Sequence, residues 1–354
     1  MPYLSRRTVV SAASLLPLAM RVAGAPAHAA SAGPLSGPLT SVLGAQQWLN
    51  TTSLQPDDLR GKVVLVNVWT YSCIYCLRTL PHLRAWTAKY KDQGLVVIGV
   101  HTPEFMFEHD LDNVRKALAF LGVGYAVPID NDYRIWHAFD NDAWPAFYFI
   151  DTEGRIRDRL DGEGSYDRSE RTIQTLLSEN SRAPRATEFV TVSGDGPEAP
   201  PDVRNVRSPE TYVGYAQGRN FVSPGGVSKD APRVYRTAPA LLLNQWNPAG
   251  LWTIGGEFAT LVEAPGSIAY RFHARDLHLI LVPPSPAHAI RFRVTIDGSL
   301  PGDSHGSDVD AQGLGTVRDA RLYQLVRQTG PIVNRTFRIE FFDPGVRAYD
   351  FTFG

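Results

Sequence analysis

Cysteine is scarce in this chain of 354 residues, which contains only Cys73 and Cys76. Two cysteines cannot form the multi-bridge framework of small disulfide-rich domains, and alone they supply too few ligands for a structural zinc site. An excess of positive charge is also lacking, because the 35 basic and 36 acidic residues leave a net charge of −1. This balance argues against a nucleic-acid partner. No uninterrupted apolar stretch is long enough to cross a membrane.

The first residues are typical of an export signal. Arg6 and Arg7 precede a short apolar core, and the sequence Ala27-His28-Ala29 fits a small-x-small cleavage site. Paired arginines before such a core predict export by the twin-arginine route. We therefore expect a signal peptide at 1–29, an extracytoplasmic location and, at 30–39, a tether rich in glycine and proline.

The two cysteines lie where a buried strand meets a helix. The apolar run 63–68 predicts the strand, and apolar residues at helical spacing follow Cys76. Cys-x-x-Cys in this context is typical of a redox pair. A helix start favours thiolate, so Cys73 is predicted to be the exposed attacking thiol and Cys76 the resolving thiol that closes the Cys73–Cys76 disulfide.

Three other interpretations remain open. A purely structural disulfide would close too small a loop to stabilise the fold much. A zinc site would need further ligands, and His82 and His101 lack ligand spacing to the cysteines. A peroxidase is suggested by Thr70-x-x-Cys73, although Val66 stands where the proline of that pattern belongs. No metal and no cofactor are expected.

Strands and helices alternate through residue 182. Strands are expected at 95–100 and 126–129 with a helix between them, and Trp144-Pro145 introduces a hairpin and a closing helix. This order resembles the thioredoxin fold, specifically extracytoplasmic oxidoreductases of the TlpA and ResA type. The segments 101–105 and 130–136 most closely resemble the thioredoxin-like part of DipZ-type proteins. The resemblance covers residues 40–182, and DipZ-type proteins also carry a β-rich tail.

The resemblance assigns roles to further residues. Glu104 matches an acid that takes the proton of the resolving cysteine, and Pro145 matches a cis-proline that, with Trp144, docks the substrate backbone. Pro81 matches a proline that kinks the helix after the cysteines. The sequence also departs from the family: Asn67 stands where thioredoxins carry a buried aspartate, and the active-site surroundings are Trp69, Ser72, Ile74 and Tyr75.

These departures bear on the chemistry of the pair. Without a cationic residue between the cysteines, the Cys73 thiolate receives less stabilisation. We expect a modestly lowered pKa for Cys73 and a reducing to intermediate potential. The missing aspartate at Asn67 places more of the proton transfer on Glu104.

The C-terminal half has a different pattern. A linker rich in proline, glycine and serine is predicted at 183–208, and alternating strands at 209–354 predict an all-β sandwich or jelly roll. The resemblance points to a carbohydrate-binding-module-like domain. A glycan platform is a candidate function for Trp246 and Trp252, with Tyr212, Tyr215 and Tyr323 as further candidates, although most aromatic residues of a sandwich belong to its core.

One loop of this half loosely resembles a calcium-binding loop. Asp308, Asp310 and Asp319 have suitable spacing, but the flanking segments are β-like, which favours a hairpin turn.

The sequence therefore predicts an exported thiol–disulfide oxidoreductase. Its partners would be protein disulfides or dithiols, together with a membrane electron-transfer protein that re-reduces the pair. The alternative is a glycan- or protein-binding module with a redox-inert thioredoxin-like scaffold.

Overall fold

The computed structural model describes residues 37–179 and 188–354, so the predicted signal peptide and most of the predicted tether lie outside the described residues. The first part is built on a four-stranded sheet in the order β3-β2-β5-β6, in which β3 is parallel and β5 antiparallel to β2. Its strands are β2 (Val63–Trp69), β3 (Leu95–His101), β5 (Ala146–Ile150) and β6 (Ile156–Asp161). A short separate pair joins β1 (Trp48–Leu49) to β4 (Val127–Pro128).

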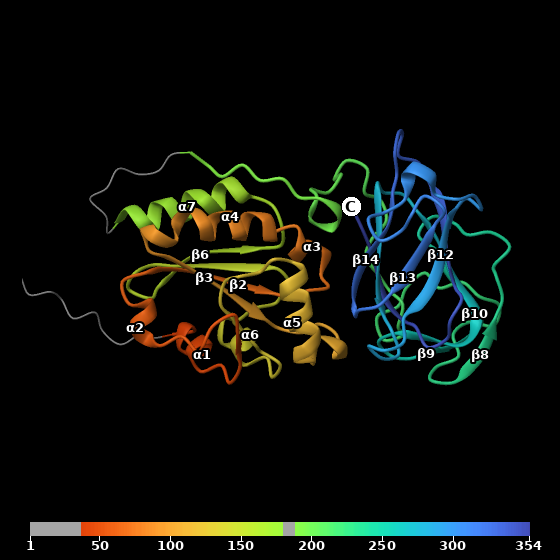
Figure 1. The fold of residues 1–354 in the computed structure, drawn as a ribbon, viewed down its shortest axis with the longest axis horizontal. Helices are drawn as coiled ribbons and strands as arrows, with labels where there is room; N and C mark the ends of the chain where they lie inside the picture. Colours follow the sequence, from red (N-terminus) through yellow and green to blue (C-terminus); the bar gives the residue numbers. More distant parts are fainter. Residues whose placement is uncertain (1–36, 180–187) are drawn as a thin grey trace, which may run out of the picture. The chain divides into compact units, whose positions relative to one another are not determined.

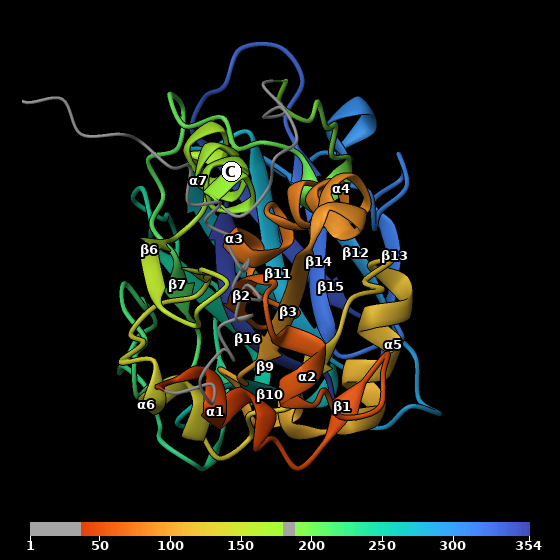
Figure 2. The same ribbon diagram turned by 90° about the vertical axis from the view of Figure 1, so that its left-hand side faces the viewer.

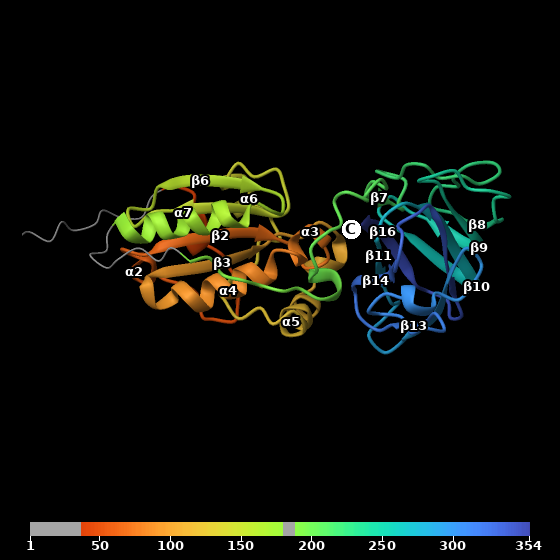
Figure 3. The same ribbon diagram turned by 90° about the horizontal axis from the view of Figure 1, so that it is seen from above.

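Helices cover both faces of this sheet, as Figures 1 and 3 show for α4 and α7 on one side. Alternate residues of β2 explain the layers: Val63 and Leu65 pack in the core with α4, α5 and α7, and Val64 and Val66 pack in the core with α1 and α6. The helices are α1 (Leu39–Leu43), α2 (Pro56–Leu59), α3 (Ile74–Leu77), α4 (Leu80–Tyr90), α5 (Leu111–Phe120), α6 (Arg134–Ala138) and α7 (Tyr166–Glu179). The predicted thioredoxin-like α/β fold is confirmed.

Two local predictions differ from the structure. The helix after the cysteines is not kinked at Pro81 but divided, because α3 ends at Leu77 and α4 begins at Leu80. Pro81 lies in the first turn of α4, where its missing N–H needs no partner. The strand expected at 126–129 joins β3 only through isolated bridges, and β4 pairs with β1 instead.

The second part is an all-β domain, as predicted. Its strands form one ten-stranded sheet with the central order β13-β12-β15-β10-β16-β11-β14, which curls over an apolar core. Figure 2 gives the view along the chain's long direction. The strands are β7 (Thr211–Tyr212), β8 (Pro232–Tyr235), β9 (Trp246–Ile254), β10 (Ala259–Phe272), β11 (Asp276–Val282), β12 (Ile290–Ile296), β13 (Leu314–Val317), β14 (Arg321–Arg327), β15 (Arg335–Phe341) and β16 (Arg347–Phe353).

Strand β11 is buried on both faces, which shows how this domain meets the first one. Leu277 and Leu279 point into the β-domain core, whereas Ile280 and Val282 join the apolar cluster that contains both cysteines. A strand buried on both faces reads as a continuous apolar run because neither face meets water. The contact between the domains therefore has an apolar centre, and the cysteines belong to it.

Candidate active site

The cysteine pair begins helix α3. Cys73 is the N-cap residue, and its sulfur accepts a hydrogen bond from the backbone N–H of Cys76 at 3.3 Å. Both cysteines are free thiols. The strand β2 ends four residues before Cys73, so the buried sheet fixes where the turn and the helix start. This is the strand, Cys-x-x-Cys and helix arrangement that the sequence predicts.

The structure corrects the expectation of an exposed, acidified Cys73. This residue is only 8% exposed and Cys76 is fully buried. Burial raises the pKa of the Cys73 thiol, and the hydrogen-bonded Cys76 and the charge of Glu104 raise it further. The helix N-terminus still offers an N–H to the sulfur, but desolvation outweighs that effect. The sequence could not show this because the groups that bury Cys73 include residues more than 200 positions away.

Aromatic rings from both domains form this cover. Tyr349 of β16 contacts Phe105 and Phe107, with ring centroids 5.3 and 4.9 Å away and edge-to-face geometry. Tyr71, two residues before Cys73, contacts Phe107 at 6.0 Å. Such offset and edge contacts are favourable for aromatic pairs. Together they shield the thiols from solvent.

Glu104 lies beside the cysteine pair, as predicted from the resemblance. Its Oε1 accepts a hydrogen bond of 2.6 Å from the hydroxyl of Tyr212, a residue of the β-domain. Burial raises the pKa of Glu104 to about 8, opposed by the Tyr212 hydrogen bond and reinforced by nearby carboxylates. A group with this pKa can both accept and donate a proton near neutral pH.

Glu108 is a site residue that the sequence analysis missed. It is fully buried, and its carboxylate accepts hydrogen bonds from the Ser72 hydroxyl at 2.6 Å and from the N–H groups of Glu104 and Phe105 at 2.6 and 3.0 Å. It thereby ties the residue before Cys73 to the loop that carries Glu104. No sequence motif indicated it, because the N-cap residue of this short turn is Phe105, which has no acceptor in its side chain, so the capping-box signature is absent.

The predicted cis bond between Trp144 and Pro145 is confirmed. The Trp144 indole N–H donates to the carbonyl of Thr102 at 3.0 Å, and Trp144 packs at the edge of the core cluster that contains the cysteines. Trp69, Ser72 and Ile74 are fully buried in the same region, whereas Tyr75 is half-buried. The assignment of Trp144 and Pro145 to substrate docking stays a prediction.

Asn67 is buried in β2, where its Nδ2 donates to the carbonyl of Ala146 at 3.3 Å and its Oδ1 has no hydrogen-bond partner among the described residues. An amide cannot take a proton from a thiol at neutral pH. Glu104 is therefore the acid whose negative charge lies close enough to Cys73 to raise the pKa of its thiol.

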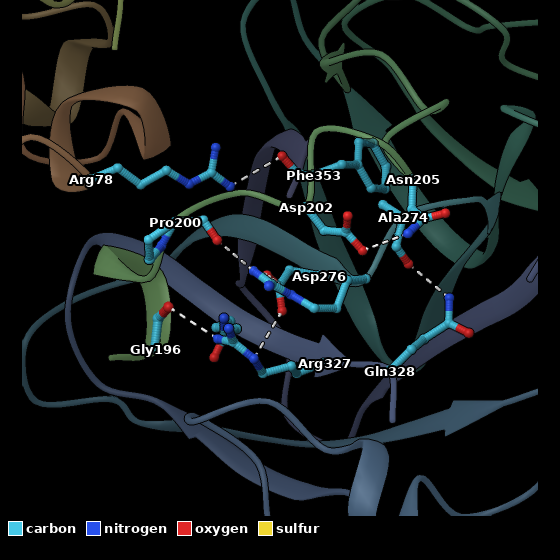
Figure 4. A network of polar contacts seen from close by, with 12 residues as sticks. Arg78, Gly196, Pro200, Asp202, Asn205, Ala274, Asp276, Arg327, Gln328 and Phe353 are labelled. Carbon is cyan, nitrogen blue, oxygen red and sulfur yellow. Dashed lines mark hydrogen bonds and ion pairs between the residues drawn. The ribbon is translucent and has the colours of Figure 1, made fainter. Parts of the chain in front are cut away.

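Arg78 connects the cysteine helix to the end of the β-domain. Its guanidinium pairs with Glu163 at 2.9 Å. It also donates to the carbonyl of Phe353 at 3.3 Å, as Figure 4 shows. The side chain is almost fully buried. Separating a buried arginine from its partners leaves buried polar or charged groups unpaired, which costs free energy, so Arg78 holds its two partners in place. Arg78 thus fixes the β-domain directly behind Cys76.

The described part of the predicted linker packs against both domains. Glu198 forms an ion pair of 2.5 Å with Arg84 of α4. Arg275 donates to the carbonyl of Pro200 at 2.7 Å, and Arg327 to that of Gly196 at 3.4 Å, both drawn in Figure 4. Residues 196–200 therefore contact both domains, which a flexible linker would not do.

Comparisons with known proteins agree with this geometry. Residues 42–159 match the model of the AhpC/TSA family, and residues 208–354 match the model described as a thioredoxin-like C-terminal domain. The DipZ protein of Mycobacterium bovis is 37% identical over 251 residues, which are 69% of this chain and 35% of that protein. The thiol–disulfide oxidoreductase YkuV of Bacillus subtilis is 27% identical over 41% of this chain and 97% of its own length. The first part of the chain is thus similar to a thiol–disulfide oxidoreductase, and its last part is similar to a thioredoxin-like C-terminal domain.

The chain spans about a third of the length of the DipZ relatives, namely 35%. Among solved structures, a thiol–disulfide isomerase from Corynebacterium glutamicum is 25% identical and covers 42% of this chain and 99% of its own, with a TM-score of 0.37. Over residues 37–179 and 188–354, none of the helices is long and apolar enough to cross a membrane.

The structure corrects the candidate glycan platform of the β-domain. Trp246 and Trp252 are 1% and 0% exposed and belong to the β-domain core, as does Tyr323. Their indole N–H groups donate to backbone carbonyls of Arg219 and Ala249. Sugar binding needs exposed rings, so these tryptophans have a packing role. The sequence could not separate the two roles because alternation does not say which face of a strand is covered.

The loop with calcium-like spacing is a turn, as favoured above. Asp310 accepts hydrogen bonds from the N–H groups of Gln312 and Leu314 at 3.0 and 2.8 Å, and Asp308 pairs with Arg321 at 2.5 Å. No group of three or more metal-ligating side chains occurs in the described part of the chain.

The raised pKa of Glu104 predicts how stability depends on pH. In the unfolded chain this carboxyl group loses its proton near pH 4.5, whereas in the folded protein it keeps the proton until about pH 8. The protonated carboxyl group therefore stabilises the fold fully below pH 4.5, and its contribution to the free energy of unfolding is lost as the pH rises from 4.5 to about 8. Glu104→Gln should remove this loss, and at pH 8 it should be more stable than wild type by about 1–3 kcal/mol, allowing for partial solvent exposure.

The measurement is the free energy of unfolding in urea at several pH values. Glu263→Gln is the matched control, because Glu263 is exposed on β10. If Glu104→Gln and wild type lost stability in parallel between pH 5 and 8, the assigned pKa of Glu104 would be wrong.

Proposed function

We propose that this chain is an exported enzyme that reduces or exchanges disulfides of extracytoplasmic proteins through Cys73 and Cys76. The observation that supports it most is the free dithiol at the N-terminus of α3, beside an acid with a pKa of about 8 and the cis Trp144-Pro145 bond. Acids with strongly perturbed pKa values are enriched at catalytic sites.

The proposed reaction has two exchange steps. Cys73 gives its proton to Glu104, and its thiolate attacks a substrate disulfide, forming a mixed disulfide while one substrate thiol leaves with a proton. Glu104 passes that proton on and then takes the proton of Cys76, the role that the resemblance assigns to it. The Cys76 thiolate attacks the Cys73 sulfur, forms the Cys73–Cys76 disulfide and releases the second substrate sulfur as a thiolate, which takes up a proton. Two electrons and two protons pass from the protein dithiol to the substrate. A dithiol donor, which we assign to a membrane electron-transfer protein, reverses the process.

Burial of Cys73 sets a condition on this reaction. A substrate sulfur must reach a thiol that is 8% exposed and covered by rings of both domains. We infer that Trp144 and Pro145, at the edge of the same cluster, receive the substrate backbone. Local opening of the covering loops would complete the access.

The test is catalytic turnover of a disulfide-bonded protein by the full chain with dithiothreitol as donor. The double variant Cys73→Ser, Cys76→Ser is the control for any uncatalysed reduction by the donor. Turnover by wild type alone supports the proposal. Equal rates for wild type and the double variant would instead support the alternative of a binding module with an inert scaffold.

Export is tested separately, because residues 1–29 lie outside the described residues. Fractionation of expressing bacterial cells should place the chain outside the cytoplasm. Replacing Arg6 and Arg7 by lysine should retain it in the cytoplasm if the twin-arginine signal operates. Unchanged fractionation of this variant would contradict the proposed route.

A further inference from the structure

Carboxyl groups of both domains gather around Glu104, the acid that acts on Cys73. Glu104 follows β3, Glu210 directly precedes β7, and Asp350 lies in β16. Strands β7 and β16 pair with Asp350 opposite Tyr212, and the Tyr212 hydroxyl donates to Glu104 at 2.6 Å. The pairing of two β-domain strands thus places Glu210 and Asp350 next to the acid of the thioredoxin-like domain.

Asp350 is buried, whereas the neighbouring Glu210 is exposed to solvent. Asp350 is 2% exposed, and its Oδ1 has no hydrogen-bond partner among the described residues. The carboxyl group of Glu210, a residue that reaches solvent, is close enough to raise the pKa of the Asp350 carboxyl group. Two adjacent carboxyl groups cannot both be ionised at low cost, so such a pair holds one proton in common.

We propose that the β-domain completes the thiol site, with Asp350 and Glu210 carrying protons between Glu104 and solvent. This inference rests on the proposed thiol–disulfide exchange and adds two positioning residues to it. The order of groups is Cys73, Glu104, Asp350 and Glu210, from the buried sulfur to the exposed carboxylate. Its basis is the strand pairing, the Tyr212 hydrogen bond and the unpartnered buried oxygen of Asp350.

The proton balance of one attack is simple. Cys73 loses its proton to Glu104, the Cys73 sulfur bonds to one substrate sulfur, and the substrate S–S bond breaks. The departing substrate thiolate takes up one proton. Glu104 returns to its starting state by passing its proton to the Asp350–Glu210 pair, whose exposed member releases a proton to water. No oxidant or reductant beyond the substrate disulfide is needed.

The electrostatics are consistent with this order. Burial, followed by the charges of Glu210 and Glu104, raises the pKa of Asp350 well above its ordinary value. The pKa of Glu210 is raised too, by desolvation of its carboxyl group, although the residue as a whole is exposed. Both groups therefore exchange protons closer to neutral pH than an ordinary carboxylate. The titratable groups around Asp350 are Glu104, Glu210, Tyr75, Tyr212 and Tyr270; beyond Tyr75 lie Cys73 and Arg78.

The test measures how fast the reduced full chain reacts with dithiodipyridine across pH. A purely electrostatic role and a proton-carrying role predict opposite results for Asp350→Asn. If the carboxyl group acted only through its charge, the variant would react as fast as wild type or faster, because a charge that disfavours the Cys73 thiolate would be left unchanged or removed. Removing a proton carrier should slow the reaction at pH 7 by roughly tenfold, and should delete one transition from the pH profile.

Glu210→Gln should have the same effect in the same direction, and as an exposed residue it keeps the test valid if Asp350→Asn fails to fold. Asp319→Asn, a half-exposed aspartate of the same domain, is the control and should leave the profile unchanged. Variant rates equal to or above wild type would overturn the inference. Failure of wild type itself to react would instead count against the proposed function.

Discussion

Replacing Cys76 with serine should trap the chain on its substrate as a stable mixed disulfide. Cys73 still attacks, but no second thiol remains in α3 to release the product. Incubation of reduced Cys76→Ser with a disulfide-bonded protein should give a new covalent species on a non-reducing gel. Dithiothreitol should cleave the mixed disulfide and remove this species. Catalytic turnover should fall to the background rate.

Cys73→Ser supplies the matched control for this prediction. It should show neither turnover nor a mixed disulfide, because Cys76 is fully buried behind the attacking position. If Cys73→Ser captured substrate as well as Cys76→Ser did, the assigned order of the two thiols would be reversed.

The second large effect should come from Glu108→Ala, which removes a buried acceptor of several hydrogen bonds. The Ser72 hydroxyl and the N–H groups of Glu104 and Phe105 would lose their partner inside the protein. Buried donors without a partner are costly, so the free energy of unfolding should fall by about 3 kcal/mol. Because the same residue holds the turn before Cys73 against the Glu104 loop, thiol reactivity should also change.

Urea unfolding and the rate of Cys73 alkylation would measure both effects. Glu108→Gln keeps an acceptor oxygen and should lose less stability, about 1 kcal/mol. Glu263→Ala controls for removal of an exposed glutamate. A Glu108→Ala variant as stable as Glu263→Ala would show that the turn does not depend on this carboxylate.

Local patterns predicted the first domain well. Apolar runs located β2 and β3, and the Cys-x-x-Cys spacing located the redox pair, whereas the cis bond was predicted only from the family resemblance. These features depend on residues close together in the chain, where period and turn chemistry are informative. The division of α3 from α4 was missed because proline fits both a kink and a first turn.

The surroundings of Cys73 could not be predicted, because they come from distant strands. Tyr212, Tyr349 and Asp350 belong to ordinary alternating segments, and nothing in their sequence indicates that one face covers a thiol. The expected exposure and lowered pKa of Cys73 were wrong for this reason. The prediction of Trp246 and Trp252 as glycan-binding residues was wrong for a related reason. A strand pattern does not show which aromatic residues neighbouring strands will cover.

The most direct test of the central claim is the reduction potential of the Cys73–Cys76 pair, measured in the full chain by equilibration against thiol buffers of defined potential. The raised pKa of Cys73 disfavours the thiolate that stabilises the reduced form of strong oxidants. We therefore predict a single two-electron transition near that of thioredoxin, about −270 mV. A pair that never forms its disulfide, or one that titrates near −120 mV as strong oxidants do, would contradict the account of a reducing enzyme.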